Sequence, residues 1–259
     1  GIITFPLTKS AVVPLYNLIS VVSSLTNQVY VITGNAGVDV AEKLKHLHFD
    51  LIHHTPGSNV ITRIYNYTRT QLTITLQMLK LSPNVDIWIF PISGEALLSS
   101  VILAKLLRKP VIMSLTSSTE VMMQYQSDPR SQLIVLFAKI NCYLANKVIL
   151  YSPSLIEEWN LEHYRHKILI AHRHFLDFNT FTVTTPLPDR APLIGYIGRL
   201  SGEKGVQHFA QALPAILSDR QDLHVLIGGD GPLKETVEAS LQEQGVSTRV
   251  DLPGWISHD

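Results

Sequence analysis

The chain alternates short apolar runs with longer segments whose apolar residues recur at helical spacing. The runs are rich in valine and isoleucine and end at glycine, proline or serine, which is typical of buried strands. In the N-terminal part they cover residues 1–5, 28–34, 85–90, 109–115 and 147–152. Because their apolar residues are continuous rather than alternating, we expect a parallel sheet that is covered by helices on both faces.

The segments between the runs predict helices. Residues 12–25 carry apolar side chains at helical spacing, namely Leu15, Leu18, Ile19, Val22 and Leu25. Residues 95–109 are a second such segment. Its end carries Lys105, Arg108 and Lys109, where the helix dipole favours cations. Strands that alternate with helices predict a doubly wound α/β domain.

The pattern breaks at residues 181–193, which contain three prolines and no helical period. We interpret them as a linker and expect two domains, residues 1–185 and 186–259. The second domain repeats the alternation, with predicted strands at 193–198, 223–229 and 249–254 and predicted helices at 205–218 and 232–244. A doubly wound sheet usually has about five or six strands, so we expect this domain to be truncated at residue 259.

Composition excludes several classes of protein. Hydrophobic residues make up 46% and charged residues 16%, which supplies a packed core, and the formal net charge is zero. A nucleic-acid binder normally carries a basic excess, so no nucleic-acid partner is expected. The single cysteine, Cys142, excludes an internal disulfide and a cysteine-based zinc site. Charged residues interrupt the most apolar stretches, 97–115 and 133–151, so neither is expected to span a membrane.

The turn at residues 198–204 carries the clearest candidate chemistry. Gly198 and Gly202 allow close approach of the backbone, and the helix that follows offers unpaired N–H groups and its positive dipole end. That helix packs inward through Val206, Phe209, Ala210 and Leu213, which leaves two cations of the turn, Arg199 and Lys204, free to face a ligand. A guanidinium and an ammonium together suit a diphosphate. The alternative is that both are solvated loop charges.

A second glycine-rich turn, residues 227–233, follows the next predicted strand. It contains Gly228, Gly229 and Gly231, and Pro232 opens the helix after it. The alternative interpretation is an ordinary strand-to-helix turn. Neither glycine cluster has the G-x-G-x-x-G spacing, so dinucleotide binding is poorly supported.

Taken in order, residues 195–213, 224–238 and 249–259 resemble the start of the donor-binding domain of group 1 (family 4) glycosyltransferases. Residues 145–181 resemble the end of that family's acceptor domain. The resemblance implies the GT-B fold, an α/β fold in which two Rossmann-like doubly wound domains face across a cleft. It also implies transfer of a sugar from a nucleotide-sugar to a glycan, lipid-linked or other acceptor, with retention, in cell-surface polysaccharide biosynthesis.

The family assigns roles to matching residues. Arg199 and Lys204, flanked by Gly198 and Gly205, would hold the donor diphosphate and replace the divalent metal that other glycosyltransferases use. No metal or other cofactor is therefore expected. Gly228, Gly229 and Gly231 would line the nucleotide side of the donor site. Gly254 and Trp255 would lie near the base of the nucleotide.

Several positions depart from the family pattern. Residues 6–14 lack the glycine pair that approaches the donor, which leaves Lys9 and Ser10 for that contact, and residues 114–120 offer Thr116 and Ser117 where many members have a histidine. Asp177 is kept in the turn where Phe175 replaces glycine. His172 and His174 lack a third metal ligand, so interdomain packing or hydrogen bonding is preferred for them. The family's E-x7-E element would lie beyond residue 259, so this chain alone is expected to be inactive.

Glu95 lies where a predicted strand ends and is our candidate for a catalytic, donor or acceptor contact in the N-terminal domain. The alternative is that it opens the next helix, where the dipole favours an acid. Two other functions stay open: a non-catalytic GT-B module that binds a nucleotide-sugar or a partner, and a sugar-nucleotide epimerase that uses Glu95 and Glu120.

Membrane contact is a hypothesis that rests on the basic end of residues 95–109 and on the tyrosine-bearing helix predicted at 59–79. The alternative is a packed helix with a solvated rim. We expect a cytoplasmic protein, because it has no disulfide, with peripheral contact at the cytoplasmic membrane face.

Overall fold

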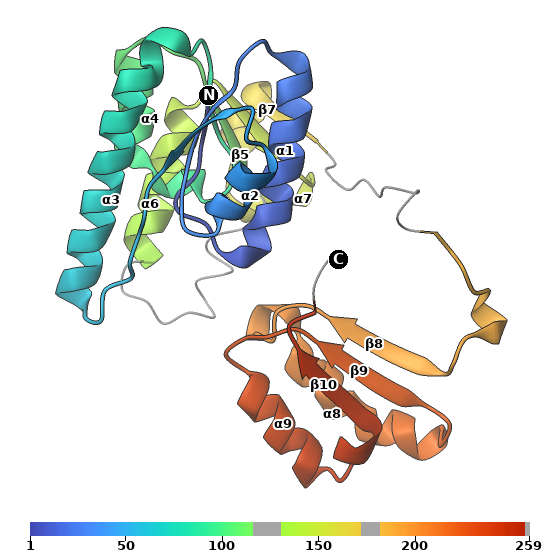
Figure 1. Cartoon of the computed structure of the whole chain (residues 1–259). Coiled ribbons are helices and arrows are strands. Elements are labelled where there is room, and N and C mark those ends of the chain that lie inside the picture. The colour runs from blue at the N-terminus through green and yellow to red at the C-terminus, as the bar shows by residue number, and fades with distance from the viewer. Residues whose placement is uncertain (116–130, 172–181, 257–259) are drawn as a thin grey trace. The chain divides into compact units, whose positions relative to one another are not determined.

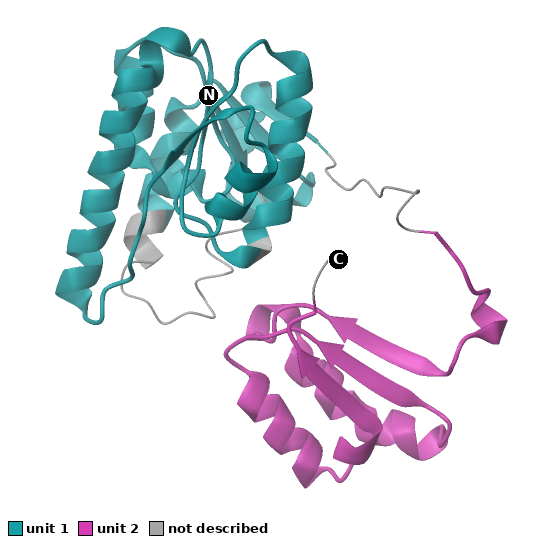
Figure 2. Ribbon diagram, in the orientation of Figure 1, with its two compact units in different colours: residues 1–173 teal, residues 174–259 magenta. Residues whose placement is uncertain are grey.

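The computed structural model describes residues 1–115, 131–171 and 182–256. The chain divides into two compact units, residues 1–173 and 174–259 (Figure 2). The predicted boundary after residue 185 lies in the irregular segment that precedes the first strand of the second unit. Each unit is an α/β structure built on a parallel sheet.

Unit 1 contains a seven-stranded parallel sheet in the order β3-β2-β1-β4-β5-β6-β7 (Figure 1). The strands are β1 Ile2–Ile3, β2 Tyr30–Thr33, β3 His48–Leu51, β4 Trp88–Phe90, β5 Val111–Leu115, β6 Lys147–Leu150 and β7 Ile168–Ile170. β1 pairs with β2 on one side, Ile2 opposite Val31, and with β4 on the other, Ile2 opposite Ile89. The chain therefore changes direction across the sheet between β1 and β4, which is the switch point where open α/β sheets bind ligands.

Helices cover both faces of this sheet, as its continuous apolar strands predict. The helices are α1 Val12–Leu25, α2 Gly37–Lys43, α3 Val60–Leu81, α4 Leu98–Leu106, α6 Ser131–Leu144 and α7 Ser154–Glu158, with short 3-10 turns at Lys9–Ala11 (η1), Ser82–Asn84, Gly94–Ala96 (η3) and Glu162–Lys167. Ile2 and Val31 face α1 and α2, whereas Ile3 and Ile32 belong to the core beneath α3, α4 and α6. Successive residues of one strand point to opposite faces, so each short strand serves both cores.

Unit 2 has three parallel strands, β8 Leu193–Ile197, β9 His224–Gly228 and β10 Val250–Gly254, in the order β10-β9-β8. Two helices, α8 Val206–Asp219 and α9 Lys234–Glu243, join them, with 3-10 turns at Leu187–Asp189, Gly202–Lys204 (η6) and Ser247–Arg249. Val225 and Ile227 of β9 form the core with both helices. On the other face of β8, Leu193 is 53% and Ile197 is 73% exposed.

The helical pattern predicted most boundaries closely. α1 covers the predicted residues, and the five elements predicted for unit 2 agree within a few residues with β8, α8, β9, α9 and β10. Leu25, one of the apolar residues at helical spacing, is 77% exposed, and it is the last residue of α1. The helix expected from residue 95 starts at Leu98, since Ser93 has a φ of 54° and η3 intervenes.

Two strands, β3 and β7, were not predicted from the sequence. β3 is an edge strand of the sequence HFDL with both ends exposed, and β7 is an edge strand whose last two residues are exposed. Neither has the buried apolar run that identified the central strands. Within the described ranges, no helix is both long and apolar enough to cross a membrane.

Candidate functional site

The turns after the three strands of unit 2 are joined through their backbones. Because the strands are parallel, their carboxyl ends meet at one edge of the sheet. Four hydrogen bonds link the turns: Gly198 N–H to Gly228 O (2.9 Å), Leu200 N–H to Asp230 O (3.0 Å), Leu233 N–H to Leu200 O (3.0 Å) and Gly229 N–H to Gly254 O (2.7 Å). Residues that the sequence placed in three separate motifs therefore form one surface.

Some glycines of this surface are needed for the close approach of the turns. Gly229 has a φ of +138°, and a Cβ there would lie 1.8 Å from the Gly198 carbonyl oxygen. A Cβ on Gly231 would lie 2.5 Å from the Leu200 carbonyl oxygen. These contacts are with backbone, which cannot swing aside as a flexible side chain can. Both glycines are thus explained by the fold itself.

Gly198 is different, because nothing in the fold requires a glycine there. Its φ is not in the left-handed region, and a Cβ would lie no closer than 3.7 Å to its nearest neighbour, the Tyr196 hydroxyl. Gly205 has open space as well, but its φ of +71° favours glycine where α8 begins. The missing side chain at Gly198 therefore leaves room for something outside the described chain, beside the α8 N-terminus.

Arg199 and Lys204 flank η6 in the same turn. The Tyr196 hydroxyl lies 3.1 Å from the Arg199 carbonyl oxygen and 3.3 Å from that of Lys204, so it can donate to either. The backbones of the two cations are therefore neighbours, although four residues separate them in sequence. The ring of Tyr196 packs on Phe209 of α8 with centroids 5.3 Å apart, which ties the turn to the helix. Both cationic side chains are exposed.

Glu203 lies between these cations and was not singled out from the sequence. Ser201 Oγ donates a 2.7 Å hydrogen bond to Glu203 Oε1, and this bond lowers the pKa of the carboxyl group. The ionised carboxylate is 3.9 Å from Arg199 Nη1. It partly neutralises the turn, so an incoming anion would compete with Glu203 for Arg199. An acid four residues after an arginine was the signal that could have identified it.

The third turn adds an aromatic ring and another cation. Trp255 is 54% exposed, directly after Gly254, whose φ is +79°. A Cβ on Gly254 would lie 3.7 Å from Lys234 Nζ, so the ammonium group of Lys234 lies over the end of β10. Lys234 was not predicted as a site residue, because a lysine in the first turn of a helix carries no motif of its own.

In unit 1, η3 follows β4 at the switch point and is held by three side chains. Tyr67 Oη donates to the Ala96 carbonyl oxygen (2.5 Å), Gln71 Nε2 bonds the same oxygen, and Asn141 Nδ2 donates to the Glu95 carbonyl oxygen (2.8 Å). A Cβ on Gly94 would lie 2.6 Å from Phe90 Cβ, so η3 packs tightly on β4. The position of Glu95 is therefore fixed by α3 and α6.

Burial raises the pKa of Glu95 from 4.5 to about 7. A carboxyl group that titrates near neutrality can give or accept a proton under physiological conditions, which suits a general acid or base. Its neighbour Cys142 is buried, and burial raises the pKa of that thiol to about 12, so it stays a protonated structural residue as its apolar sequence context predicts. Glu95 precedes α4 in η3 instead of opening the helix.

Of the remaining residues that the sequence pointed to, only some lie in the described part of the chain. Ser10 and Lys9 lie in η1, which follows β1 at the same switch point. Thr116, Ser117, Glu120, His172, His174, Phe175 and Asp177 lie outside the described residues. Among the residues that are described, no three histidine, cysteine, aspartate or glutamate side chains gather as a metal site would require.

The sequence of unit 2 matches a known family. Residues 177–259 match the model of the family described as glycosyl transferases group 1. The match lies within unit 2 and covers less than half of the chain.

Curated relatives match the same part of the chain. An alpha-D-kanosaminyltransferase of Streptomyces kanamyceticus is 32% identical over 71 residues, which are 27% of this chain and 18% of that protein. The 2-deoxystreptamine glucosyltransferase of the same organism is 35% identical over 68 residues, 26% of this chain and 18% of that protein. The matched segment thus spans less than a fifth of the length of these relatives.

Solved structures show the fold over the whole chain. The apo form of the lipopolysaccharide outer core galactosyltransferase WaaB has a TM-score of 0.59 at 17% identity, covering 99% of this chain and 69% of that one. A UDP-N-acetylglucosamine 2-epimerase has a TM-score of 0.61 at 14% identity, covering 99% and 69%. The GT-B fold expected from the sequence is confirmed. At these identities the likeness concerns the fold alone, since transferases and an epimerase share it.

Substitution by alanine should separate Gly229, which the fold needs, from Gly198, which it does not. We expect Gly229→Ala to lower the free energy of unfolding of unit 2 by at least ~2 kcal/mol, because its Cβ meets backbone. Gly198→Ala should change that free energy by less than ~0.5 kcal/mol yet weaken binding of a nucleoside diphosphate. Thermal unfolding and calorimetric titration with UDP, GDP and ADP measure the two effects.

Gly195→Ala is the control, because a Cβ at Gly195 in β8 meets nothing within 4 Å. It should alter neither stability nor binding. Unchanged nucleotide affinity in Gly198→Ala, in a protein whose wild type binds the nucleotide, would contradict a ligand role for the turn.

The raised pKa of Glu95 predicts a pH-dependent stability of unit 1. Between about pH 4.5 and about pH 7 the folded state keeps a proton that the unfolded state releases, so the free energy of unfolding falls as pH rises through this range. The total fall is on the order of 3 kcal/mol. Glu95→Gln should abolish it, whereas Glu42→Gln, at an exposed position of α2, should leave it in place. Hydrogen exchange of the strand amides of unit 1 at several pH values measures the slope, and equal slopes in wild type and Glu95→Gln would show that Glu95 does not titrate as stated.

Proposed function

We propose that the protein transfers a sugar from a nucleoside diphosphate sugar to an acceptor and that the turn between β8 and α8 holds the donor diphosphate. The observation that carries the proposal is Gly198. It is a glycine that the fold does not need, next to Arg199 and beside a helix N-terminus. The match of unit 2 to the group 1 glycosyl transferases supports the same role for the turn.

The chemistry of the turn fits a leaving diphosphate. As the bond between the sugar and the diphosphate breaks, negative charge grows on the phosphate oxygens. A guanidinium that binds two oxygens, an ammonium and the first N–H groups of α8 stabilise that charge without a metal ion. The Tyr196 hydroxyl group bonds the backbone of the turn at Arg199 and Lys204, which keeps the two residues that carry the cations close together. The absence of a metal requirement is part of the proposal.

In unit 1 we propose Glu95 as the group that exchanges a proton with the acceptor. A carboxyl group with a pKa of about 7 can exchange a proton with an acceptor hydroxyl group. We propose retention at the sugar, as the family resemblance implies, which NMR of the anomeric proton of the first product would test. The epimerase alternative rests on fold likeness alone, whereas the family match of unit 2 favours transfer.

Replacing either cation should reduce turnover. In the full-length enzyme we expect Arg199→Ala and Lys204→Ala each to lower the turnover number by ~10²-fold, because each removes one charge that stabilises the leaving group. Arg220→Ala is the matched control: Arg220 is exposed, pairs with Asp222 at 2.7 Å and lies at the C-terminal end of α8, away from the turn. Initial rates of sugar release from a panel of nucleotide-sugars measure the effect.

Turnover that is unchanged in both variants would contradict the proposal. A wild-type protein that binds donors but neither hydrolyses nor transfers them would favour the binding-module alternative. An epimerised free donor as the product would favour the epimerase.

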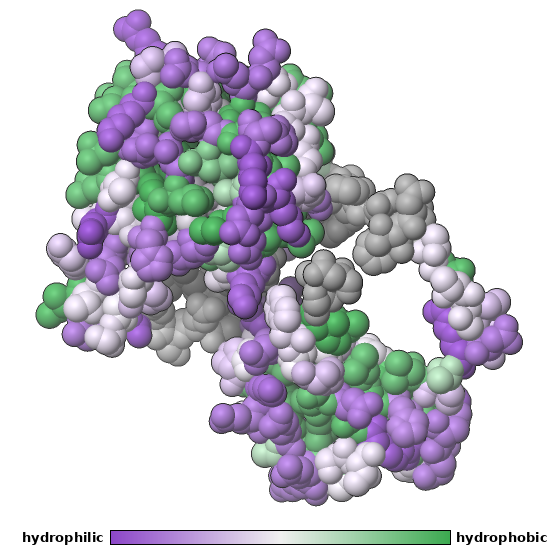
Figure 3. Space-filling model, in the orientation of Figure 1, coloured by the Kyte–Doolittle hydropathy of each residue, from purple (hydrophilic) through white to green (hydrophobic). Residues whose placement is uncertain are grey.

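The proposal extends to a lipid-linked acceptor on an anionic membrane. α3 presents an exposed apolar ridge in two parts, separated by the exposed polar residues Thr68 and Arg69. The ridge is made of Ile61 (80% exposed), Ile64 (50%), Tyr65 (64%), Leu72 (55%), Leu76 (60%) and Leu79 (46%). Figure 3 shows apolar residues along the side of unit 1 where Figure 1 places α3 and α4. Lys105 and Arg108 lie at the end of the neighbouring helix, α4. Exposed apolar side chains beside cations are the combination by which helices lie on anionic membrane surfaces.

Sedimentation with vesicles tests the membrane proposal. The wild type should sediment with phosphatidylglycerol vesicles and less with phosphatidylcholine vesicles, and high salt should weaken binding. Leu76→Asp should reduce sedimentation several-fold, because it puts a negative charge on the ridge. Leu187→Asp, at a 78% exposed position of unit 2, should not. Equal sedimentation of both variants would exclude the ridge as the contact.

A further inference from the structure

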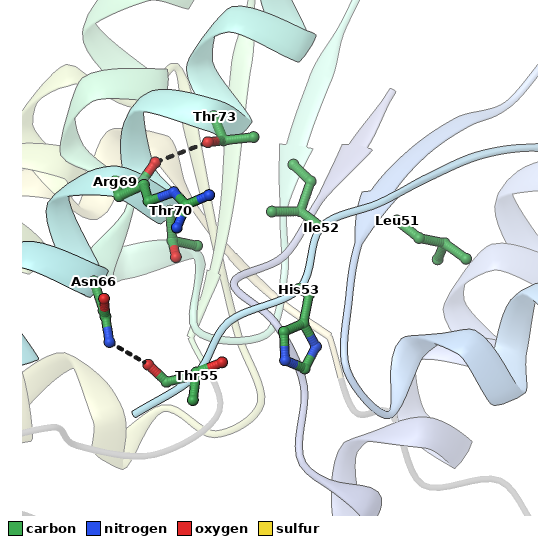
Figure 4. A pocket seen from close by; sticks show the side chains of 8 residues that line it. All are labelled: Leu51, Ile52, His53, Thr55, Asn66, Arg69, Thr70 and Thr73. Atoms are coloured by element: carbon green, nitrogen blue, oxygen red, sulfur yellow. Dashed lines mark hydrogen bonds between the residues drawn. The ribbon is translucent and has the colours of Figure 1, made fainter. Parts of the chain in front are cut away.

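A polar pocket opens on the other flank of α3. It has a volume of about 360 Å³ and lies between α3 and the segment that follows β3 (Figure 4). We call it the α3 pocket; its lining residues are Leu51, Ile52, His53, Thr55, Asn66, Arg69, Thr70 and Thr73. It is separate from the surface formed by the turns of unit 2, since all its residues belong to unit 1.

The lining suits an anion that also carries hydroxyl groups. Among the described residues that line it are one guanidinium, Arg69, one imidazole, His53, and three threonine hydroxyls, but no carboxylate. Arg69 projects from α3 toward the Ile52 side of the hollow in Figure 4. Within the described part of the chain, its guanidinium makes no ion pair. A partnerless arginine facing a concave polar surface is a typical phosphate or carboxylate ligand.

Hydrogen bonds hold the polar walls in place. Asn66 Nδ2 donates to the Thr55 carbonyl oxygen (2.9 Å) and Thr73 Oγ1 donates to the Arg69 carbonyl oxygen (2.9 Å), both drawn in Figure 4. The buried Thr70 hydroxyl is 2.8 Å from His54 Nδ1. The pocket therefore exists before any ligand binds, which lowers the ordering cost of binding.

The pocket also adjoins the switch point that holds Glu95. Leu51 ends β3, so the pocket is at the carboxyl edge of the sheet, where ligands bind in open α/β folds. The ring of His54, bonded to Thr70 in the pocket wall, packs on Phe5 with centroids 4.8 Å apart, and Phe5 packs on Tyr67 at 5.6 Å. Tyr67 in turn bonds η3, which carries Glu95.

On α3 the pocket borders the apolar ridge. At about 100° per residue, Arg69 and Thr73 lie on the helix surface directly beside Leu72 and Leu76 of the ridge. A ligand with an anionic head and an apolar tail could place the head in the pocket and the tail on the ridge. A soluble sugar phosphate would use the pocket alone.

We infer that the α3 pocket binds the anionic, hydroxyl-bearing group of the acceptor, such as a sugar phosphate or a phosphate-linked polyol. Naming the ligand as the acceptor rests on the proposed transfer function. Binding of an anionic, hydroxyl-bearing ligand in the pocket does not depend on that function. Arg69 holds the anionic group, and the threonine hydroxyls and His53 bond the hydroxyl groups.

The test uses glucose 1-phosphate as the anionic probe and glucose as the neutral one. His53 ring signals in NMR, assigned with His53→Asn, report binding in the pocket, and a saturating nucleoside diphosphate keeps the probe from the Arg199 turn. We expect glucose 1-phosphate to shift these signals and glucose not to. Arg69→Gln should weaken glucose 1-phosphate at least ~10-fold, the worth of a charged hydrogen bond. Lys80→Gln, a charge loss on α3 outside the pocket, should have no effect.

The other outcomes distinguish a lipid headgroup from a soluble phosphate and include the results that would contradict the inference. Loss of phosphatidylglycerol vesicle binding in Arg69→Gln, together with loss of probe binding, points to a lipid headgroup; loss of probe binding alone points to a soluble phosphate. Equal probe affinity in wild type and Arg69→Gln, or no shift of the His53 signals, would overturn the inference. Failure of nucleoside diphosphates to bind the wild type would defeat the proposed function and leave the pocket result intact.

Discussion

The turns after β8, β9 and β10 touch through their backbones, and the whole candidate donor site depends on that contact. A 2.7 Å hydrogen bond joins Gly229 N–H to the Gly254 carbonyl oxygen, and a side chain on Gly229 would collide with Gly198. Parallel strands deliver their ends to one edge, but only glycines let the following turns close on one another. Once closed, they place Arg199, Glu203 and Lys204 of the turn after β8 on a common surface with Lys234, the first residue of α9.

In unit 1, side chains instead of backbone contacts hold the turn at the end of the central strand in place. Its switch-point turn, η3, is held by Tyr67, Gln71 and Asn141, which come from helices far away in sequence. α6 is fixed in turn by Lys167, whose buried ammonium group donates to the carbonyl oxygens of Cys142 (2.6 Å), Tyr143 (2.9 Å) and Ala145 (3.1 Å) at the end of the helix. Buried polar groups of this kind must all be satisfied, so they specify one position for η3 and for the carboxyl group of Glu95.

α3 combines three roles in one helix because its faces differ. Ile74 and Met78 are fully buried in the core, Leu72 and Leu76 form the exposed ridge, and Arg69 and Thr73 line the pocket between ridge and core. The Asn59–Thr62 capping box fixes where the helix starts and therefore which residues reach each face. The apolar ridge and the α3 pocket therefore lie on adjacent faces of one helix, whose residues Tyr67 and Gln71 also bond the 3-10 turn that carries Glu95.

The sequence by itself determined the fold class, the central strands, the bounds of α1 and the pairing of Arg199 with Lys204, because these follow from local periodicity and spacing. The family resemblance added the group 1 assignment of unit 2. Only the tertiary structure showed β3, β7, Glu203, Lys234 and the α3 pocket. Edge strands lack a buried apolar run, and Arg69 and His53 carry no common motif. The sequence also does not distinguish Gly198 from Gly229, because both are glycines in glycine-rich turns. They differ in how close the neighbouring backbone comes to each, which only the tertiary structure decides.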